Sequence, residues 1–142
     1  MKIQFYLAVS LLVGFAAPSV FADGYVCKGK GYHAKVYHQS NPENGTRSPA
    51  VFVVSRERMG TLVAAKGKDI ERITAEDTLI YETHDNRADN GRYAYAALEI
   101  FKESDSDFYS EDTYYARLVL NADHVRHRIK MVCERYTKHG QD

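Results

Sequence analysis

The chain has 142 residues, with 19 basic and 19 acidic side chains, so its formal net charge at pH 7 is zero. This length suits one domain rather than two, and the balanced charge argues against a nucleic-acid-binding protein. Hydrophobic residues make up 44% of the chain and aromatic residues 12%, which excludes a disordered protein, because disorder requires low hydrophobicity and high net charge.

The N-terminal segment has the pattern of a secretory signal peptide. One positive residue precedes an apolar run over 3–17, and the small residues Val20 and Ala22 stand at the minus-three and minus-one positions of a cleavage site. The run is short for a membrane span. The sequence therefore predicts a signal peptide at 1–22, a single β-domain at 23–142, a periplasmic or secreted location, and no stable membrane insertion after signal removal.

Export also determines the chemistry of the two cysteines. Cys27 and Cys133 are the only pair in the chain, and an exported protein enters an oxidising compartment. We therefore expect a disulfide between them. Closing a loop of about 100 residues is worth about 4.7 kcal/mol in the chain-entropy model.

Period-two alternation of apolar and polar residues, interrupted by Gly, Asn and Pro, predicts short β-strands along the chain. The expected strands are 25–27, 33–38, 50–55, 61–65, one or two within 70–81, 93–101, 114–120 and 125–134. A short helix through 69–77 is the one alternative. The pattern predicts an all-β fold, either a small up-and-down antiparallel β-barrel of about eight strands or a sandwich. A disulfide that joins the first and last strands favours the barrel.

Such a barrel could enclose a ligand or could be filled by its own side chains. A lipocalin-like carrier of a small apolar ligand is the alternative function, and its lumen would be formed by Val36, Ala94, Leu98, Leu118, Ile129 and Met131.

The histidines give no pattern that is typical of a catalytic or metal site. His124 and His127 are three residues apart, and residues at this spacing on a strand point to opposite faces. For His127, we expect partial burial. His84 and Asp85 could form a base and its orienting carboxylate, but no nucleophile motif accompanies them. The sequence predicts a non-enzymatic protein with no cofactor and no metal.

Segment 103–112 carries five carboxylates and two aromatic residues. The glycine that an EF-hand calcium loop needs at its sixth position is absent. A solvated hairpin tip and a weak calcium site remain open interpretations. A third is a loop that binds a basic protein through Asp105, Asp107, Phe108 and Tyr109, with charges for steering and aromatic rings as anchors.

The last expected strand carries the opposite charge, since Arg126, Arg128 and Lys130 share one face. These residues could contact an anionic glycan or lipid headgroup. Alternatively, they could protect an exposed edge strand from association.

Four short segments resemble the periplasmic inhibitors of C-type lysozyme. They are Tyr25-Val26-Cys27, Val36-Tyr37, Asn90-Gly91-Arg92-Tyr93 and Cys133. The resemblance implies a small antiparallel barrel whose beginning and end are joined by a disulfide. It also implies a lysozyme-facing surface at Asn90, Gly91, Arg92 and Tyr93, where Asn90 occupies the position of the family's serine.

Together, these observations predict an exported, non-enzymatic binding module that inhibits a cationic cell-wall hydrolase such as lysozyme. The predicted partner-binding residues are Asn90, Gly91, Arg92, Tyr93, Asp105, Asp107, Phe108 and Tyr109.

Overall fold

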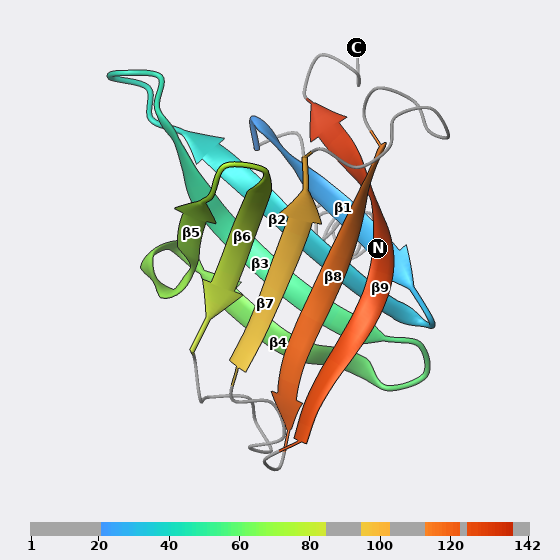
Figure 1. Cartoon of the computed structure of the whole chain (residues 1–142). Helices are drawn as coiled ribbons and strands as arrows, with labels where there is room; N and C mark the ends of the chain where they lie inside the picture. The colour runs from blue at the N-terminus through green and yellow to red at the C-terminus, as the bar shows by residue number, and fades with distance from the viewer. Residues whose placement is uncertain (1–20, 85–94, 103–112, 123–124, 138–142) are drawn as a thin grey trace, which may run out of the picture.

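The computed structural model describes residues 21–84, 95–102, 113–122 and 125–137, which form nine β-strands and one 3-10 turn (Figure 1). The elements are β1 (Asp23–Gly29), β2 (Tyr32–Ser40), β3 (Arg47–Arg56), β4 (Gly60–Lys66), the turn η2 (Gly67–Asp69), β5 (Glu71–Thr74), β6 (Thr78–Thr83), β7 (Tyr95–Phe101), β8 (Thr113–Ala122) and β9 (Val125–Thr137). Within these ranges no helix is long and apolar enough to cross a membrane. The predicted all-β class is confirmed.

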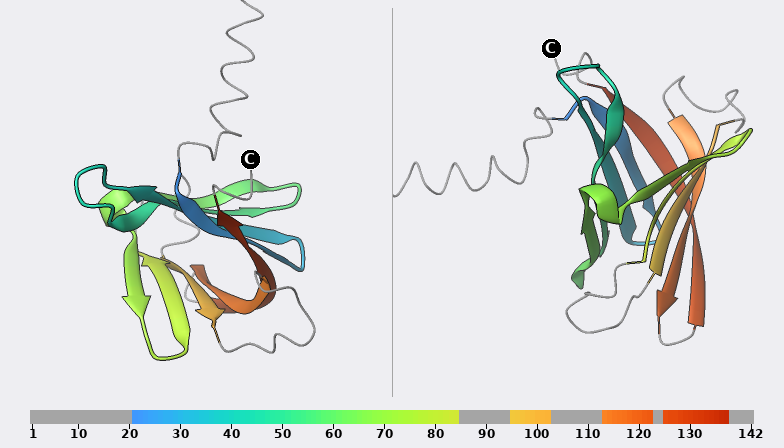
Figure 2. Two further views of the ribbon diagram at one scale, coloured as in Figure 1. Left: turned by 90° about the horizontal axis from the view of Figure 1, so that it is seen from above. Right: turned by 90° about the vertical axis from the view of Figure 1, so that its left-hand side faces the viewer.

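All nine strands belong to one antiparallel sheet in the order β4-β3-β2-β1-β9-β8-β7-β6-β5. Every strand pairs with the strand before and after it in sequence, except that β4 and β5 do not pair with each other, and the first and last strands lie side by side. The sheet curls until β1–β4 face β5–β8 across the interior (Figure 2). The fold is therefore an up-and-down half-barrel of nine strands, where about eight were expected, with β4 and β5 as its two edges.

The segment after η2 corrects one sequence expectation. A helix through 69–77 is wrong, because residues Glu71–Thr74 form β5 and pair with β6. Ile70 already has extended backbone angles and its N–H bonds to the carbonyl of Gly67, which ends the turn after three residues. The backbone groups that follow are satisfied by the neighbouring strand instead of by a helix.

Two hairpin turns have the geometry that their residues favour. Lys30 and Gly31 both have positive φ, at 49° and 81°, as the central residues of a type I′ turn require. Between β2 and β3, Gly45 has a φ of 71° and its N–H bonds to the carbonyl of Asn41. Asn and Gly thus interrupt the strands at this point, between the strands predicted at 33–38 and 50–55.

Apolar side chains from every strand except β5 fill the interior. They are Cys27, Ala34, Val36, Phe52, Val54, Val63, Ala65, Leu79, Tyr81, Ala96, Leu98, Ile100, Ala116, Leu118, Leu120, Ile129, Met131 and Cys133, together with Ile70 from the η2 connection. Five of the six residues expected to line a lumen belong to this packed cluster, and Ala94 lies outside the described residues. The curl of the sheet thus buries one continuous core.

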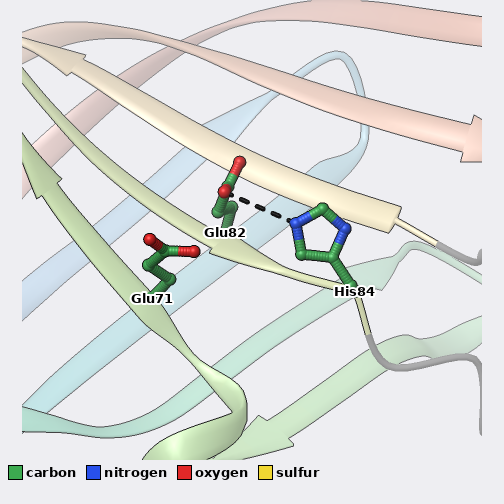
Figure 3. A group of neighbouring side chains, drawn as sticks. All are labelled: Glu71, Glu82 and His84. Atoms are coloured by element: carbon green, nitrogen blue, oxygen red, sulfur yellow. Dashed lines mark ion pairs between the residues drawn. The ribbon is translucent and has the colours of Figure 1, made fainter.

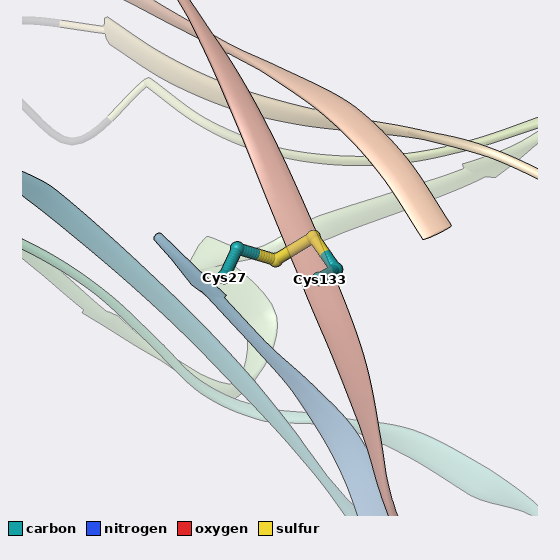
Figure 4. Close-up of a disulfide and its surroundings, with 2 residues drawn as sticks. All are labelled: Cys27 and Cys133. Carbon is teal, nitrogen blue, oxygen red and sulfur yellow. A yellow bond between two sulfur atoms is a disulfide. The ribbon is translucent and has the colours of Figure 1, made fainter. Parts of the chain in front are cut away.

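The disulfide joins the two chain ends of the barrel. Cys27 of β1 stands directly opposite Cys133 of β9 in the sheet register, and the two sulfur atoms are bonded (Figure 4). Both side chains are fully buried. The predicted pairing and the predicted contact between the first and last strands are both confirmed.

Candidate functional site

All eight predicted partner-binding residues lie outside the residues that the structure describes. Asn90, Gly91, Arg92 and Tyr93 belong to segment 85–94, and Asp105, Asp107, Phe108 and Tyr109 to segment 103–112. The first segment directly precedes β7 and the second directly follows it. Along the chain, 85–94 connects β6 to β7 and 103–112 connects β7 to β8. The outer surface of β7 and of the strands beside it is described.

This outer surface carries three carboxylates, one on each of the strands β5, β6 and β7. Alternation along each strand directs Tyr81 and Leu98 into the core and Glu82 and Glu99 outward. Glu71 stands directly opposite Glu82 in the β5–β6 register. We call Glu71, Glu82 and Glu99 the acidic face.

Two residues of the acidic face, Glu71 and Glu82, form a compact group with His84 (Figure 3). One ligand atom from each residue lies within 4.8 Å of the other two. Glu82 Oε1 is 3.5 Å from His84 Nε2. Two carboxylates and an imidazole are donors that suit a divalent transition metal.

Tyr95 holds this group in place. Its hydroxyl donates a 2.9 Å hydrogen bond to Glu82 Oε2, and its ring centre is 5.1 Å from that of His84. Burial and the hydrogen bond to Glu82 raise the pKa of Tyr95 to about 12. The phenol therefore stays protonated at neutral pH and remains a donor to the carboxylate.

The next part of the outer surface carries the opposite charge. We call the following residues of β1, β2 and β9 the basic face: Lys28, Lys35, Arg126, Arg128 and Lys130. Arg117 of β8 lies at the boundary, where its Nε is 2.6 Å from Glu99 Oε1. Because β9 pairs with β1 on one side and β8 on the other, its cations do not protect an exposed edge strand. His127 is exposed rather than partly buried.

A buried polar network joins the two halves of the sheet at one end of the interior. His38 of β2 lies between Asp23 of β1 and Tyr81 of β6, with Nδ1 2.7 Å from Asp23 Oδ1 and Nε2 2.6 Å from the Tyr81 hydroxyl. Arg47 Nη1 donates a 2.7 Å bond to Asp23 Oδ2, and Arg135 Nη2 is 3.8 Å from the same oxygen. Among the described residues, no buried side-chain polar atom lacks a partner.

This geometry assigns the protons of the network. An ionised carboxylate can only accept, so His38 donates from Nδ1 to Asp23, and its Nε2 accepts from the Tyr81 hydroxyl. Burial lowers the pKa of His38 below 6.5, against the opposing effect of Asp23. Burial also raises the pKa of Tyr81. The network is therefore satisfied with a neutral imidazole and a protonated phenol.

An aspartate, a histidine and a hydroxyl in series also occur in hydrolytic active sites. In this chain the Tyr81 side chain is 0% exposed, so its hydroxyl has no access to a substrate. We interpret the network as a structural connection between β1, β2 and β6.

Comparison with protein-family models, with curated proteins and with solved structures finds no match to this chain. The fold and the surface define it as a disulfide-linked antiparallel half-barrel whose outer surface has one acidic and one basic face.

Sequence reasoning considered His84 only with Asp85, which lies outside the described residues, and missed its proximity to Glu82. The available signal was their spacing, since residues two apart on a strand share a face. The contact with Glu71 depends on the β5–β6 register, which no local pattern specifies. Sequence reasoning also missed that the interior would hold Asp23, His38 and Tyr81 as a connected group.

Proposed function

We propose that this chain is an exported, non-enzymatic binding module that recognises a basic protein through its acidic face. The target class is a cationic cell-wall hydrolase such as C-type lysozyme, whose activity the module would inhibit. The observation that carries the proposal is the separation of charge on the outer surface, with carboxylates over β5–β7 and cations over β9, β1 and β2.

Export is part of the proposal. Removal of a signal peptide at 1–22 would leave a chain that begins at the first residue of β1. The disulfide between Cys27 and Cys133 is compatible with an oxidising compartment. Together, these two features support the proposed periplasmic or secreted localisation.

Surface recognition has better support than transport of an apolar ligand. Five of the six residues expected to line a lumen belong to one packed core cluster: Val36, Leu98, Leu118, Ile129 and Met131. A carrier function would require that space for its ligand. No observation on the described residues favours the carrier.

The acidic face combines charge with apolar contact area. Glu99 stands opposite Ile80 in the register, and Phe101 stands opposite Tyr115, which is 39% exposed. Carboxylates would steer a basic partner during its approach, and the ring and aliphatic side chains would supply buried contact area. This mixture is typical of a protein-binding surface rather than of a purely solvated one.

Neutralising the acidic face is expected to weaken lysozyme binding. The triple variant Glu71→Gln, Glu82→Gln, Glu99→Gln should bind C-type lysozyme about tenfold more weakly, since each exposed charge pair contributes roughly 0.5 kcal/mol. Calorimetry at low salt with EDTA present would measure the affinity. A lysozyme activity assay with a large molar excess of the processed protein would measure inhibition.

The basic face supplies the matched control. The variant Lys28→Gln, Lys35→Gln, Arg128→Gln also removes three charges and should bind lysozyme at least as strongly as the wild type. Unchanged lysozyme activity in excess wild-type protein would refute the inhibitor proposal. Equal loss of binding in both triple variants would refute the assignment to the acidic face.

A further inference from the structure

We propose that Glu71, Glu82 and His84 bind a Zn²⁺ ion on the outer surface of β5 and β6. This site goes beyond the proposed recognition of a basic protein and does not depend on it. The sequence predicted no metal, because His84 was considered only with Asp85 and Glu71 is distant from it in the chain. The β5–β6 register brings these three together from two strands (Figure 3).

The distances fit a tetrahedral ion. Zinc binds imidazole nitrogen and carboxylate oxygen at about 2.0–2.2 Å, so two ligands of one tetrahedral ion lie about 3.3–3.6 Å apart by simple geometry. Glu82 Oε1 and His84 Nε2 are 3.5 Å apart, and the Glu71 oxygen lies within 4.8 Å of both. A rotation of the exposed Glu71 side chain brings its carboxylate to the same ion.

The local charge also favours a cation. Glu71 and Glu82 stand directly opposite each other in an antiparallel pair, an arrangement in which like charges repel and destabilise the sheet. Among the described residues, no lysine or arginine forms an ion pair with Glu71 or Glu82. A divalent ion would neutralise both carboxylates, and the imidazole would complete a three-residue ligand set with one position left for water.

Tyr95 acts as a positioning residue for this site. Its hydroxyl engages Glu82 Oε2, which leaves Oε1 directed at the imidazole, and its ring packs against the His84 ring. Hydrogen bonds of this kind to a ligating carboxylate fix its orientation and commonly change metal affinity by about 10-fold to 100-fold.

Zinc titration of the untagged, processed protein in EDTA-free buffer at pH 7 tests the proposal. Calorimetry with zinc chloride is expected to give one ion per chain. His84→Ala should weaken zinc binding more than tenfold, and Glu71→Gln and Tyr95→Phe should each weaken it about tenfold. His33→Ala removes another histidine with a partly exposed side chain, one that lies 3.8 Å from Glu57, and should leave the affinity unchanged.

Cobalt(II) supplies a second measurement, since visible absorption of the bound ion reports tetrahedral nitrogen and oxygen ligands and should disappear in His84→Ala. Absence of zinc binding at millimolar concentration would overturn the proposal. So would binding that His84→Ala leaves unchanged.

The two proposals can fail separately. Lysozyme binding is measured in EDTA, where His84→Ala retains all three carboxylates and should bind as the wild type does. Zinc binding is measured without lysozyme, where Glu99→Gln should bind as the wild type does.

Discussion

Replacing Cys27 and Cys133 together by alanine is expected to lower the free energy of unfolding by about 4–5 kcal/mol. The disulfide closes a loop with a sequence separation of 106, and the entropy that a cross-link removes from the unfolded chain grows with loop length. A domain is typically stable by only about 5–15 kcal/mol, so the variant should be close to unfolding at room temperature. Urea denaturation followed by circular dichroism measures the change.

Reduction of the wild-type disulfide provides the control for this prediction. Protein that is reduced in denaturant and refolded with reductant should unfold at the same urea concentration as the double variant. The dependence of the free energy on urea should also become steeper in both samples, because an unfolded chain without the cross-link exposes more surface. A loss below about 1 kcal/mol would mean that the hydrogen bonds of β1 to β2 and β9 hold the barrel without the disulfide.

Replacing His38 by alanine is expected to lower the free energy of unfolding by about 3 kcal/mol. The substitution leaves the Tyr81 hydroxyl and one oxygen of Asp23 without their buried partner, and each unsatisfied buried group costs about 1–3 kcal/mol. It also opens a cavity in a packed interior. Chemical denaturation at pH 7.5 measures the change.

His33 offers a matched comparison for His38 because it lies on the same strand, β2, but faces outward. His33→Ala should change stability by no more than about 0.5 kcal/mol, as expected for an exposed position. If the two alanine variants were equally stable, the interior network would contribute nothing to the fold.

Stability should also depend on pH through His38. Burial lowers the pKa of folded His38 below 6.5, whereas the unfolded residue takes up its proton near 6.5. Below pH 6.5 the unfolded state therefore binds more protons, and the free energy of unfolding decreases as the pH falls toward the folded pKa. Protonation would also reverse the Tyr81 hydrogen bond, since Nε2 would become a donor.

The charged and titratable groups around the His38 ring define the control for this pH effect. Asp23 favours its protonation, whereas Arg47 and Arg72 oppose it, and Tyr81 is the partner of Nε2. Denaturation curves between pH 7.5 and 5.5 should show a smaller loss of stability in His38→Ala than in the wild type. Parallel curves for the two proteins would contradict the assignment to His38.

Much of the fold followed from local pattern. Alternation in 94–101 and 125–134 predicts which side chains enter the core, and Ala96, Leu98, Ile129 and Met131 are buried as that alternation requires. The buried positions can be predicted from the sequence because successive side chains of a strand point to opposite faces of the sheet. Alternation cannot show where the sheet opens, and the break between β4 and β5 is visible only in the pairing of strands distant in sequence.

The candidate sites were less predictable than the fold. The predicted partner-binding residues Asn90 to Tyr93 and Asp105 to Tyr109 lie outside the described residues, so recognition through them stays a prediction. A charged face on a single strand could be predicted from the sequence, as for Arg126, Arg128 and Lys130. The acidic face was not, because its three carboxylates come from three strands and become neighbours only through cross-strand register.

By itself, the sequence determined the all-β class, the positions of most strands and the pairing of Cys27 with Cys133. Alternation can be recognised within each short segment, and two cysteines allow only one pairing. Only the tertiary structure decided which polar groups meet. Glu71 reaches Glu82 and His84, and Asp23 reaches Tyr81 through His38, by way of strand register and the curl of the sheet. Those contacts depend on how the whole chain buries its apolar side chains, and no short segment encodes them.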